Sequence, residues 1–180
     1  MCGIPGMAVV DPAKAPDRVI LARMADILRH RGPDGDGFHV GPGIGLAFRR
    51  LAIIDLATGE QPIANEDGTV VVVCNGEIYN HVELRARLAA SGHRFRTASD
   101  VETIVHLYED HGDRFVDHLR GMFAIALWDA PRRRLLLARD RFGIKPLYYA
   151  ATDDALVFGS EQKAILASGA VRPEPDLQGM

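Results

Sequence analysis

Short apolar runs separated by turn residues dominate the hydrophobic pattern of this chain. Most runs come in pairs joined by glycine, proline or aspartate, which is typical of hairpins. The run 70–74 is mostly valine, and this indicates a strand buried on both faces. The predicted strands are residues 6–10, 38–40, 44–48, 51–54, 70–74, 123–128, 135–139, 147–151 and 155–158.

Other segments have the apolar spacing of amphipathic helices. We predict helices over residues 16–30, 80–91, 99–112 and 160–167. Asn80 and Glu83 have the spacing of a capping box at the second helix, and Ser99 with Glu102 repeats that spacing at the third. Ser160 is predicted to cap the last helix.

The order of these elements predicts the fold class. Strands follow one another through hairpins instead of alternating with helices, so the sheets should be mainly antiparallel and the class α+β. A chain of 180 residues fits one domain. The tail 169–180 contains Pro173 and Pro175 and is predicted to begin a linker, which leaves residues 1–168 as the folded domain.

Composition narrows the class of protein. The net charge of -3 and the pI near 6.1 give no electrostatic reason to expect nucleic acid, and the arginine run 132–134 is typical of a solvated hairpin tip. Cys2 and Cys74 are too few and too far apart for a disulfide framework. Apolar runs are too short to cross a membrane, and the start lacks the pattern of a secretory signal. We therefore predict a cytoplasmic protein.

Cys2 is the first candidate for chemistry. Removal of Met1 would expose the α-amine of Cys2 beside its thiol. Reference pKa values are about 7.7–8.0 for such an amine and about 8.5 for the thiol, so the amine can accept the thiol proton near neutral pH. Such a residue is a nucleophile with its own base. The alternative is a cysteine that merely follows the first residue, and a Met-Cys pair alone does not choose between them.

The sequence Asn75-Gly76-Glu77 directly follows the valine run, at a predicted strand end. A two-residue Asn-Gly hairpin is one explanation. The following residues, however, lead into a helix and not into a returning strand. The other explanation is an oxyanion hole, because acyl transfer requires donors such as a side-chain amide and a glycine N–H.

Arg49-Arg50 and Asp100 are charged residues that could hold a small substrate. The planar fork of arginine matches a carboxylate, although an arginine pair at a surface bulge explains the same residues. Asp100 follows Ser99 at a predicted helix start, where an acidic side chain also stabilises the helix dipole. Residue type alone leaves both alternatives open.

Six motifs occur in order along the chain: Met1-Cys2-Gly3-Ile4, residues 29–35 (RHRGPDG), residues 49–56 (RRLAIIDL), residues 75–80 (NGEIYN), Ser99-Asp100 with Glu102, and residues 139–149 (RDRFGIKPLYY). Over about residues 1–168 the chain resembles the glutaminase domain of glutamine-dependent asparagine synthetases. These are class II glutamine amidotransferases of the N-terminal-nucleophile type. Related sugar-phosphate and purine-pathway amidotransferases share the cysteine start and an Asn-Gly pair, but the third and last motifs resemble the asparagine synthetase branch.

The resemblance implies a four-layer α/β/β/α fold with two stacked, mainly antiparallel sheets. It assigns Cys2 as the nucleophile, and Asn75 with the N–H of Gly76 as the oxyanion hole. Arg50 would hold the α-carboxylate of free glutamine and Asp100 its α-ammonium. The remaining substrate contacts that it implies are Leu51, Ala52, Ile53, Ile54 and Glu77.

The implied reaction is attack of Cys2 on the side-chain amide of L-glutamine, giving a γ-glutamyl thioester, glutamate and ammonia. In full-length relatives a synthetase domain that uses ATP and Mg²⁺ consumes the ammonia, so we expect that domain in cis or as a partner subunit. We expect no metal or cofactor in this segment, and the resemblance allows a homodimer. Two alternatives stay open: the same glutaminase serving another acceptor, and a non-catalytic module that binds glutamine.

The chain departs from the family pattern at a few positions. Phe48 stands where histidine is common, and Pro5, Val101 and Gln162 also differ. None of them is assigned a catalytic role. Pro5 and Val101 adjoin the implied site, so they are expected to alter pocket shape or turnover.

Other candidate sites are weaker. Residues 34–37 lack the spaced ligands and closing glutamate of a calcium loop. His106, His111 and His118 show no ligand pair at a useful spacing, so we predict that they lie on solvated faces. Cys74, inside an apolar run, is predicted to be a buried packing residue.

Overall fold

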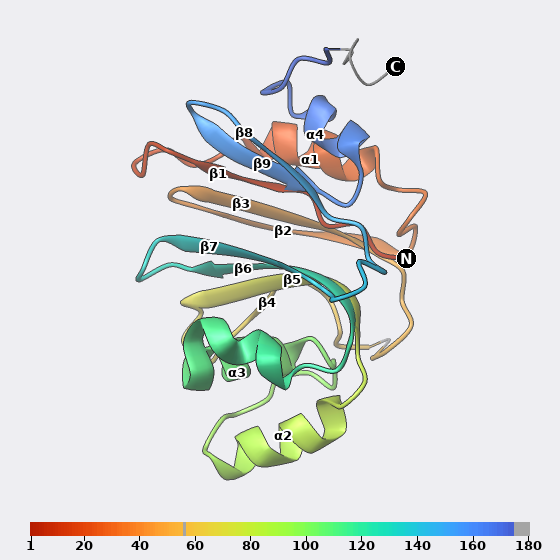
Figure 1. Ribbon diagram of the computed structural model, residues 1–180, viewed down its shortest axis with the longest axis vertical. Helices are drawn as coiled ribbons and strands as arrows, with labels where there is room; N and C mark the ends of the chain where they lie inside the picture. Colours follow the sequence, from red (N-terminus) through yellow and green to blue (C-terminus); the bar gives the residue numbers. More distant parts are fainter. Residues whose placement is uncertain (56, 175–180) are drawn as a thin grey trace.

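Two antiparallel sheets lie face to face, and helices cover the outer face of each (Figure 1). The structure, a computed structural model, describes residues 1–55 and 57–174. The resulting four layers are helix, sheet, sheet and helix. This arrangement confirms the α+β class and the α/β/β/α layering predicted from the sequence.

The five-stranded sheet has the order β2-β3-β1-β9-β8, and the four-stranded sheet has the order β4-β5-β6-β7. Neighbouring strands within both sheets are antiparallel. The strands are β1 (Gly6–Val9), β2 (Gly35–Gly41), β3 (Ile44–Arg50), β4 (Ile63–Ala64), β5 (Val70–Ile78), β6 (Gly121–Asp129), β7 (Arg134–Arg139), β8 (Tyr148–Ala151) and β9 (Ala155–Gly159).

The outer layers consist of α1 (Arg18–Asp26) with α4 (Gln162–Ala167) on one side, and α2 (His81–Ala90) with α3 (Glu102–His111) on the other (Figure 1). A 3₁₀ helix, η1 (Gly112–His118), continues from α3. Asp17 caps α1 by accepting a hydrogen bond from the N–H of Val19. The helix predicted over residues 16–30 is present, but it is shorter than predicted, because turns follow Asp26.

Strand β5 separates two cores, because successive side chains of a strand point to opposite faces. Val71 and Val73 face the core between the two sheets, together with Phe48 and Phe158. Val70, Val72 and Cys74 face the core under α2 and α3. The predicted burial on both faces is confirmed, and so is the packing role of Cys74.

The strand predictions omitted β4, and two of them need correction. β5 continues to Ile78, so Asn75, Gly76 and Glu77 lie inside a strand and not at its end. The extension forms because β6 pairs with β5 along its full length. Residues 51–54, predicted as a strand, are irregular, because the β2–β3 pairing ends at Arg50.

The predicted helix caps at Asn80 and Ser160 are wrong, because each side chain bonds elsewhere, and the capping box predicted at Ser99 does not form, because Glu102 bonds to the loop before it. Asn80 donates to the carbonyl oxygen of His118 at the end of η1 and accepts from the N–H of Arg120. Ser99 accepts from the N–H of Val101 just before α3, and the helix has no side-chain cap. Ser160 accepts from the N–H of Ile4 near the N-terminus.

His106 does not face solvent, contrary to the prediction. It lies on the inner side of α3 and is fully buried. Its ring meets the edge of Phe95 and lies beside the ring of His93, with centroid distances of 4.6 Å in both cases. A helix places residues three or four apart on one face, and the hydrophobic face of α3 carries His106 into the fold.

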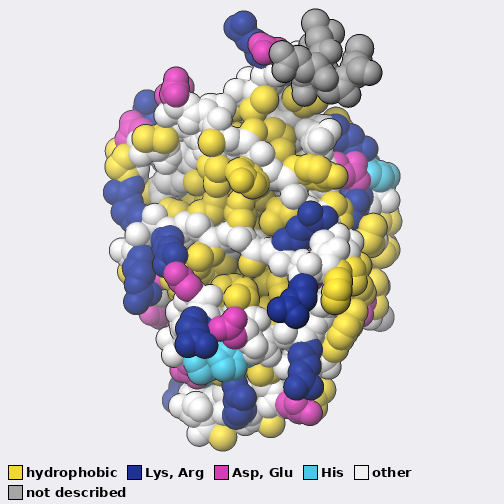
Figure 2. Space-filling model, viewed as in Figure 1, with side chains coloured by type: hydrophobic (Ala, Val, Ile, Leu, Met, Phe, Trp, Pro, Cys, Tyr) yellow, Lys and Arg dark blue, Asp and Glu magenta, His cyan; other side chains and the backbone are white. Residues whose placement is uncertain are grey.

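The face of the molecule in Figure 2 carries basic side chains spread among acidic and hydrophobic ones. No helix in the described part of the chain combines the length and apolar character needed to cross a bilayer. Residues 169–174 follow α4 without helix or strand, and the rest of the predicted linker, 175–180, lies outside the described residues. The domain boundary at residue 168 stays a prediction.

Candidate active site

The N-terminal segment is fixed to the end of β3, and this contact positions Cys2. Gly3 and Arg49 exchange backbone hydrogen bonds of 2.9 Å and 2.8 Å. Cys2 Sγ then lies against the backbone of Leu51, 3.4 Å from its N–H nitrogen and 3.6 Å from its carbonyl oxygen. The nucleophile predicted from the sequence is thus held by residues about fifty positions away.

The electrostatics of the site oppose ionisation of the Cys2 thiol. Burial raises the pKa of the thiol. The N–H of Leu51, the charge of the Met1 ammonium, Arg50 and Lys145 act in the opposite direction without cancelling the effect of burial on this pKa. A thiol in this position needs a nearby base before it can act as a nucleophile near neutral pH.

Arg31 is a positioning residue that the sequence analysis did not assign. Its Nε donates to the carbonyl oxygen of Cys2 at 3.0 Å, and its Nη1 pairs with Glu161 at 2.9 Å. The Arg31 side chain is mostly buried. The residue belongs to the RHRGPDG motif, so the sequence contained a signal for it. The contacts that define its role are with residues far away along the chain, and the sequence does not show them.

Asn75 presents an unpartnered donor inside the protein. It is 1% exposed, and among the described residues its Nδ2 has no hydrogen-bond partner. Val71 and Val73 face the core between the sheets, so Asn75, two residues further along β5, points the same way. An unpaired buried amide donor is costly, which makes it a candidate for binding a ligand oxygen.

Gly76 offers a second donor at the same place. The N–H groups of Cys74 and Ile78 point outward from the edge of β5 opposite to β6. They donate to the side chains of Gln61 and Asp100, respectively. Backbone N–H groups alternate along a strand, so the N–H of Gly76 points to that same edge. A Cβ at Gly76 would collide with the carbonyl oxygen of Met122, which explains why glycine occupies the position.

One cleft brings most of the predicted site residues together. Cys2, Asn75 and Gly76 line it, and so do these predicted substrate contacts: Arg50, Leu51, Ile53, Ile54, Glu77 and Asp100. Ala52 does not line the cleft, and its N–H donates to Asp34 at 2.9 Å. Two of the unusual residues, Phe48 and Val101, line the cleft as well.

The charged groups in the cleft are arranged by backbone contacts. The Arg50 guanidinium donates to the carbonyl oxygen of Asp55 in the irregular segment after β3. Asp100 is buried, and its Oδ2 accepts from the N–H of Ile78 at 2.7 Å. A cation and an anion therefore lie in the walls of a single cleft.

Lys145 and Gln61 also line the cleft, and the sequence analysis assigned neither. Lys145 is 7% exposed, and no described carboxylate lies within ion-pair distance of its ammonium. Asp140 shapes the loop that carries it by accepting from the N–H of Ile144 and of Lys145. The RDRFGIKPLYY motif contains Lys145, but only the folded loop shows that it reaches the cleft.

This geometry supports acyl transfer on a small zwitterionic amide. It combines a thiol, two donors suited to an oxyanion, and opposite charges for an α-carboxylate and an α-ammonium. The two stacked antiparallel sheets, with helices outside, give the chain the fold of the N-terminal-nucleophile amidotransferases.

The chain belongs to the family of glutamine amidotransferase domains, whose model matches residues 1–180. It is 48% identical over 169 residues to asparagine synthetase [glutamine-hydrolyzing] 2 of Bacillus subtilis, a match that covers 93% of this chain and 22% of that protein. It is also 48% identical over 166 residues to asparagine synthetase [glutamine-hydrolyzing] 2 of Oryza sativa, covering 92% of this chain and 28% of that protein. The chain thus corresponds to the N-terminal glutaminase part of these relatives and spans less than a third of their length.

A solved structure shows the same fold. Glutamine phosphoribosylpyrophosphate amidotransferase from B. subtilis aligns with a TM-score of 0.75 and 23% identity, covering 94% of this chain and 44% of that chain. The four-layer architecture inferred from the six motifs is therefore present in a protein of low sequence identity.

Proposed function

We propose that Cys2 hydrolyses the side-chain amide of free L-glutamine. The observation that carries this proposal is the buried, unpartnered Nδ2 of Asn75 in the wall of the cleft that holds Cys2 Sγ. An amide donor left without a partner in a site lined by a thiol suits a ligand oxygen that gains negative charge.

Removal of Met1 supplies the base in this mechanism. The free α-amine of Cys2 takes the thiol proton, and the thiolate adds to the side-chain carbonyl carbon of glutamine. The oxyanion accepts hydrogen bonds from Asn75 Nδ2 and Gly76 N–H. The carbon–nitrogen bond then breaks, the α-ammonium returns its proton to the leaving nitrogen, and ammonia departs. Water hydrolyses the γ-glutamyl thioester, which restores the thiol and releases glutamate.

The charges in the cleft support selection of the free amino acid. Arg50 binds the α-carboxylate, and Asp100 with Glu77 binds the α-ammonium. A glutamine inside a peptide has neither charge at its Cα, so it loses both contacts. The backbone of residues 51–54 forms the adjoining wall, and Leu51, Ile53 and Ile54 line the cleft there.

The ammonia acceptor belongs to a part of the enzyme beyond this domain. The curated relatives are named glutamine-hydrolysing asparagine synthetases, and this chain spans only a fraction of their length. We infer that the domain supplies ammonia for amide synthesis by an ATP- and Mg²⁺-dependent synthetase domain, in cis or as a partner subunit. Its free thiols suit a reducing cytoplasm. Homodimer formation also stays a proposal.

Mass spectrometry combined with a glutaminase assay tests the chemistry. The intact mass should show loss of Met1, and diazo-oxo-norleucine, a glutamine-like electrophile, should add once to the wild type and to Cys74→Ala but not to Cys2→Ala. Glutamine hydrolysis should be abolished in Cys2→Ala. In Asn75→Ala kcat should fall about 10²–10³-fold, because one oxyanion donor is lost.

Each result has an opposite that would remove the proposal. Equal hydrolysis by wild type and Cys2→Ala, or retention of Met1 in active protein, excludes the N-terminal cysteine mechanism. Binding of glutamine without any turnover by protein lacking Met1 would favour a non-catalytic glutamine-binding module.

A further inference from the structure

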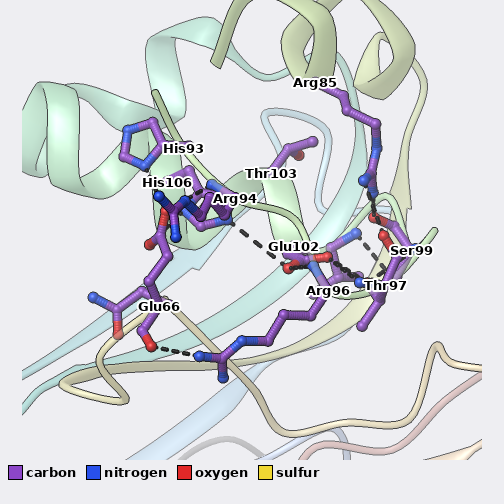
Figure 3. A network of polar contacts seen from close by, with 12 residues as sticks. Glu66, Arg85, His93, Arg94, Arg96, Thr97, Ser99, Glu102, Thr103 and His106 are labelled. Carbon is purple, nitrogen blue, oxygen red and sulfur yellow. Dashed lines mark hydrogen bonds and ion pairs between the residues drawn. The ribbon is translucent and has the colours of Figure 1, made fainter. Parts of the chain in front are cut away.

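Four metal-binding side chains converge on the outer side of the four-stranded sheet, apart from the residues that line the active-site cleft. Glu66 lies in the turn between β4 and β5, His93 follows α2, and His106 and Glu109 lie three residues apart on α3. One ligand atom from each of them lies within 4.8 Å of all the others. Figure 3 shows His93 and His106 close to Glu66.

Most of the donor-atom separations are near those of a tetrahedral metal site, with a different oxygen of Glu66 facing each histidine. His106 Nδ1 lies 3.2 Å from Glu109 Oε2 and 3.3 Å from a Glu66 carboxylate oxygen. His93 Nδ1 lies 3.2 Å from the other Glu66 oxygen and 3.7 Å from Glu109 Oε2. Zinc bonds to nitrogen and oxygen measure about 2.0–2.2 Å, so tetrahedral ligands lie about 3.3–3.6 Å apart. We propose that Glu66, His93, His106 and Glu109 form a structural Zn²⁺ site.

Neighbouring groups orient the ligands, as in known metal sites. His93 Nε2 lies 3.2 Å from Asp110 Oδ1, so the opposite nitrogen, Nδ1, is directed at the cluster. Glu109 Oε1 accepts from the side chain of Asn65 at 2.8 Å, which leaves Oε2 toward the histidines. The N–H of Arg94 donates to Glu66 at 2.9 Å.

The buried His106 gives the strongest indication of a ligand. Its side chain is 1% exposed, and within the described structure its Nε2 has no hydrogen-bond partner. The nearest carboxylate to this nitrogen is Glu102, at 3.9 Å. A metal on Nδ1 requires the proton on Nε2, and this places the N–H toward the Glu102 carboxylate in a carboxylate–histidine–metal arrangement.

Charge and coordination chemistry favour zinc over other cations. Two carboxylates and two neutral imidazoles carry a charge of about -2, which one divalent ion neutralises. Calcium and magnesium require six or more oxygen ligands, whereas imidazole ligands with tetrahedral geometry suit Zn²⁺.

The site would join three segments behind the cleft. It would fix the β4–β5 turn and the loop after α2 to the helix that follows Asp100. The same loop is already held by Glu102, which accepts from the N–H groups of Arg96 and Thr97 (Figure 3). The ion therefore has a structural role that is independent of the chemistry proposed at Cys2.

Zinc titration against a chromophoric chelator tests the site in chelator-treated protein. Wild type should bind one Zn²⁺ per chain and melt at a higher temperature with Zn²⁺ than without it. Co²⁺ in its place should give the visible absorption of a tetrahedral complex. His93→Gln and Glu109→Gln, which alter partly exposed ligands, should each bind zinc at least about tenfold more weakly and lose the zinc-dependent rise in Tm.

Two control variants locate the ion. Cys2→Ala removes the cleft thiol, and His118→Gln removes one of a stacked histidine pair, His111 with His118, outside the cluster; both should bind zinc like the wild type. Absence of zinc binding by the wild type, unchanged affinity in His93→Gln and Glu109→Gln, or loss of binding in either control overturns the site. Since Cys2→Ala abolishes hydrolysis but keeps the zinc site, failure of one proposal is distinguishable from failure of the other.

Discussion

Lys145 places a positive charge beside the sulfur atom on which the proposed reaction depends. Its ammonium is mostly buried, and its charge opposes the effect of burial on the pKa of Cys2. Negative charge develops on this sulfur when the thiol ionises. A lysine in this position therefore favours the thiolate.

Replacing Lys145 with methionine should slow modification of Cys2. Loss of the positive charge raises the pKa of the thiol further, and the rate of alkylation follows the thiolate fraction. At pH 7 the alkylation rate with iodoacetamide should fall roughly two- to tenfold, and the pH profile should move to higher pH. The exposed Lys14→Met variant is the matched control. An unchanged pH profile in Lys145→Met would contradict this role.

At the scale of elements, the edge of β5 at the active site is completed by the side chain of Gln61, which makes the hydrogen bonds that a neighbouring strand would make. Gln61 Oε1 accepts from the N–H of Cys74 at 2.6 Å, and Gln61 Nε2 donates to the carbonyl of the same residue at 3.2 Å. β4 is too short to reach this part of β5. Gln61 therefore satisfies the backbone next to Asn75 and Gly76.

Gln61→Met should destabilise the protein while preserving side-chain volume. The N–H and carbonyl of Cys74 would lose their partners in a buried setting, and the free energy of unfolding should fall by about 2 kcal/mol. Urea unfolding measures the change, with the exposed Gln162→Met as the control. A loss below about 0.5 kcal/mol would show that water replaces Gln61 without cost.

At the scale of the whole molecule, Glu161 joins the helical layer over the five-stranded sheet to the N-terminal segment. It pairs with His30 and Arg31 at 2.9 Å and with Lys163 at 3.0 Å. Partial burial opposes ionisation, but hydrogen bonds from Arg31, Lys163 and His30 outweigh it and lower the pKa of Glu161 to about 2. Its ordinary pKa is near 4.5.

This shift predicts a loss of stability in acid. A carboxylate with a lowered pKa stabilises the fold fully above its unfolded pKa, near 4.5, and the contribution disappears as the pH falls toward 2. Glu161→Gln should be less stable than wild type by about 1–2 kcal/mol at pH 6, after allowance for solvent screening, and the difference should close near pH 2. Chemical unfolding across that range measures it, with the exposed Glu83→Gln as control. A difference that does not depend on pH would contradict the ion-pair explanation.

Much of the candidate site could be predicted because its residues lie in motifs whose order resembles a known family. Cys2, Arg50, Asn75 and Asp100 all reach one cleft. Arg31, Gln61 and Lys145 were missed as site residues, because their roles come from contacts with distant backbone or from a loop that must fold first. Ala52 does not line the cleft, and its contact with the substrate stays a prediction.

The sequence by itself determined most of the strands, the hairpins and the α+β class, since these depend on apolar runs and local turns that neighbouring residues encode, while the layering came from the family resemblance. The tertiary structure decided which groups the polar side chains form hydrogen bonds with. Asn80 and Ser160 are predicted as helix caps, yet they bond to other parts of the backbone. His106 joins Glu66 and His93 only after three segments pack together, because hydrogen bonds and metal ligation depend on distance in space and not on separation along the chain.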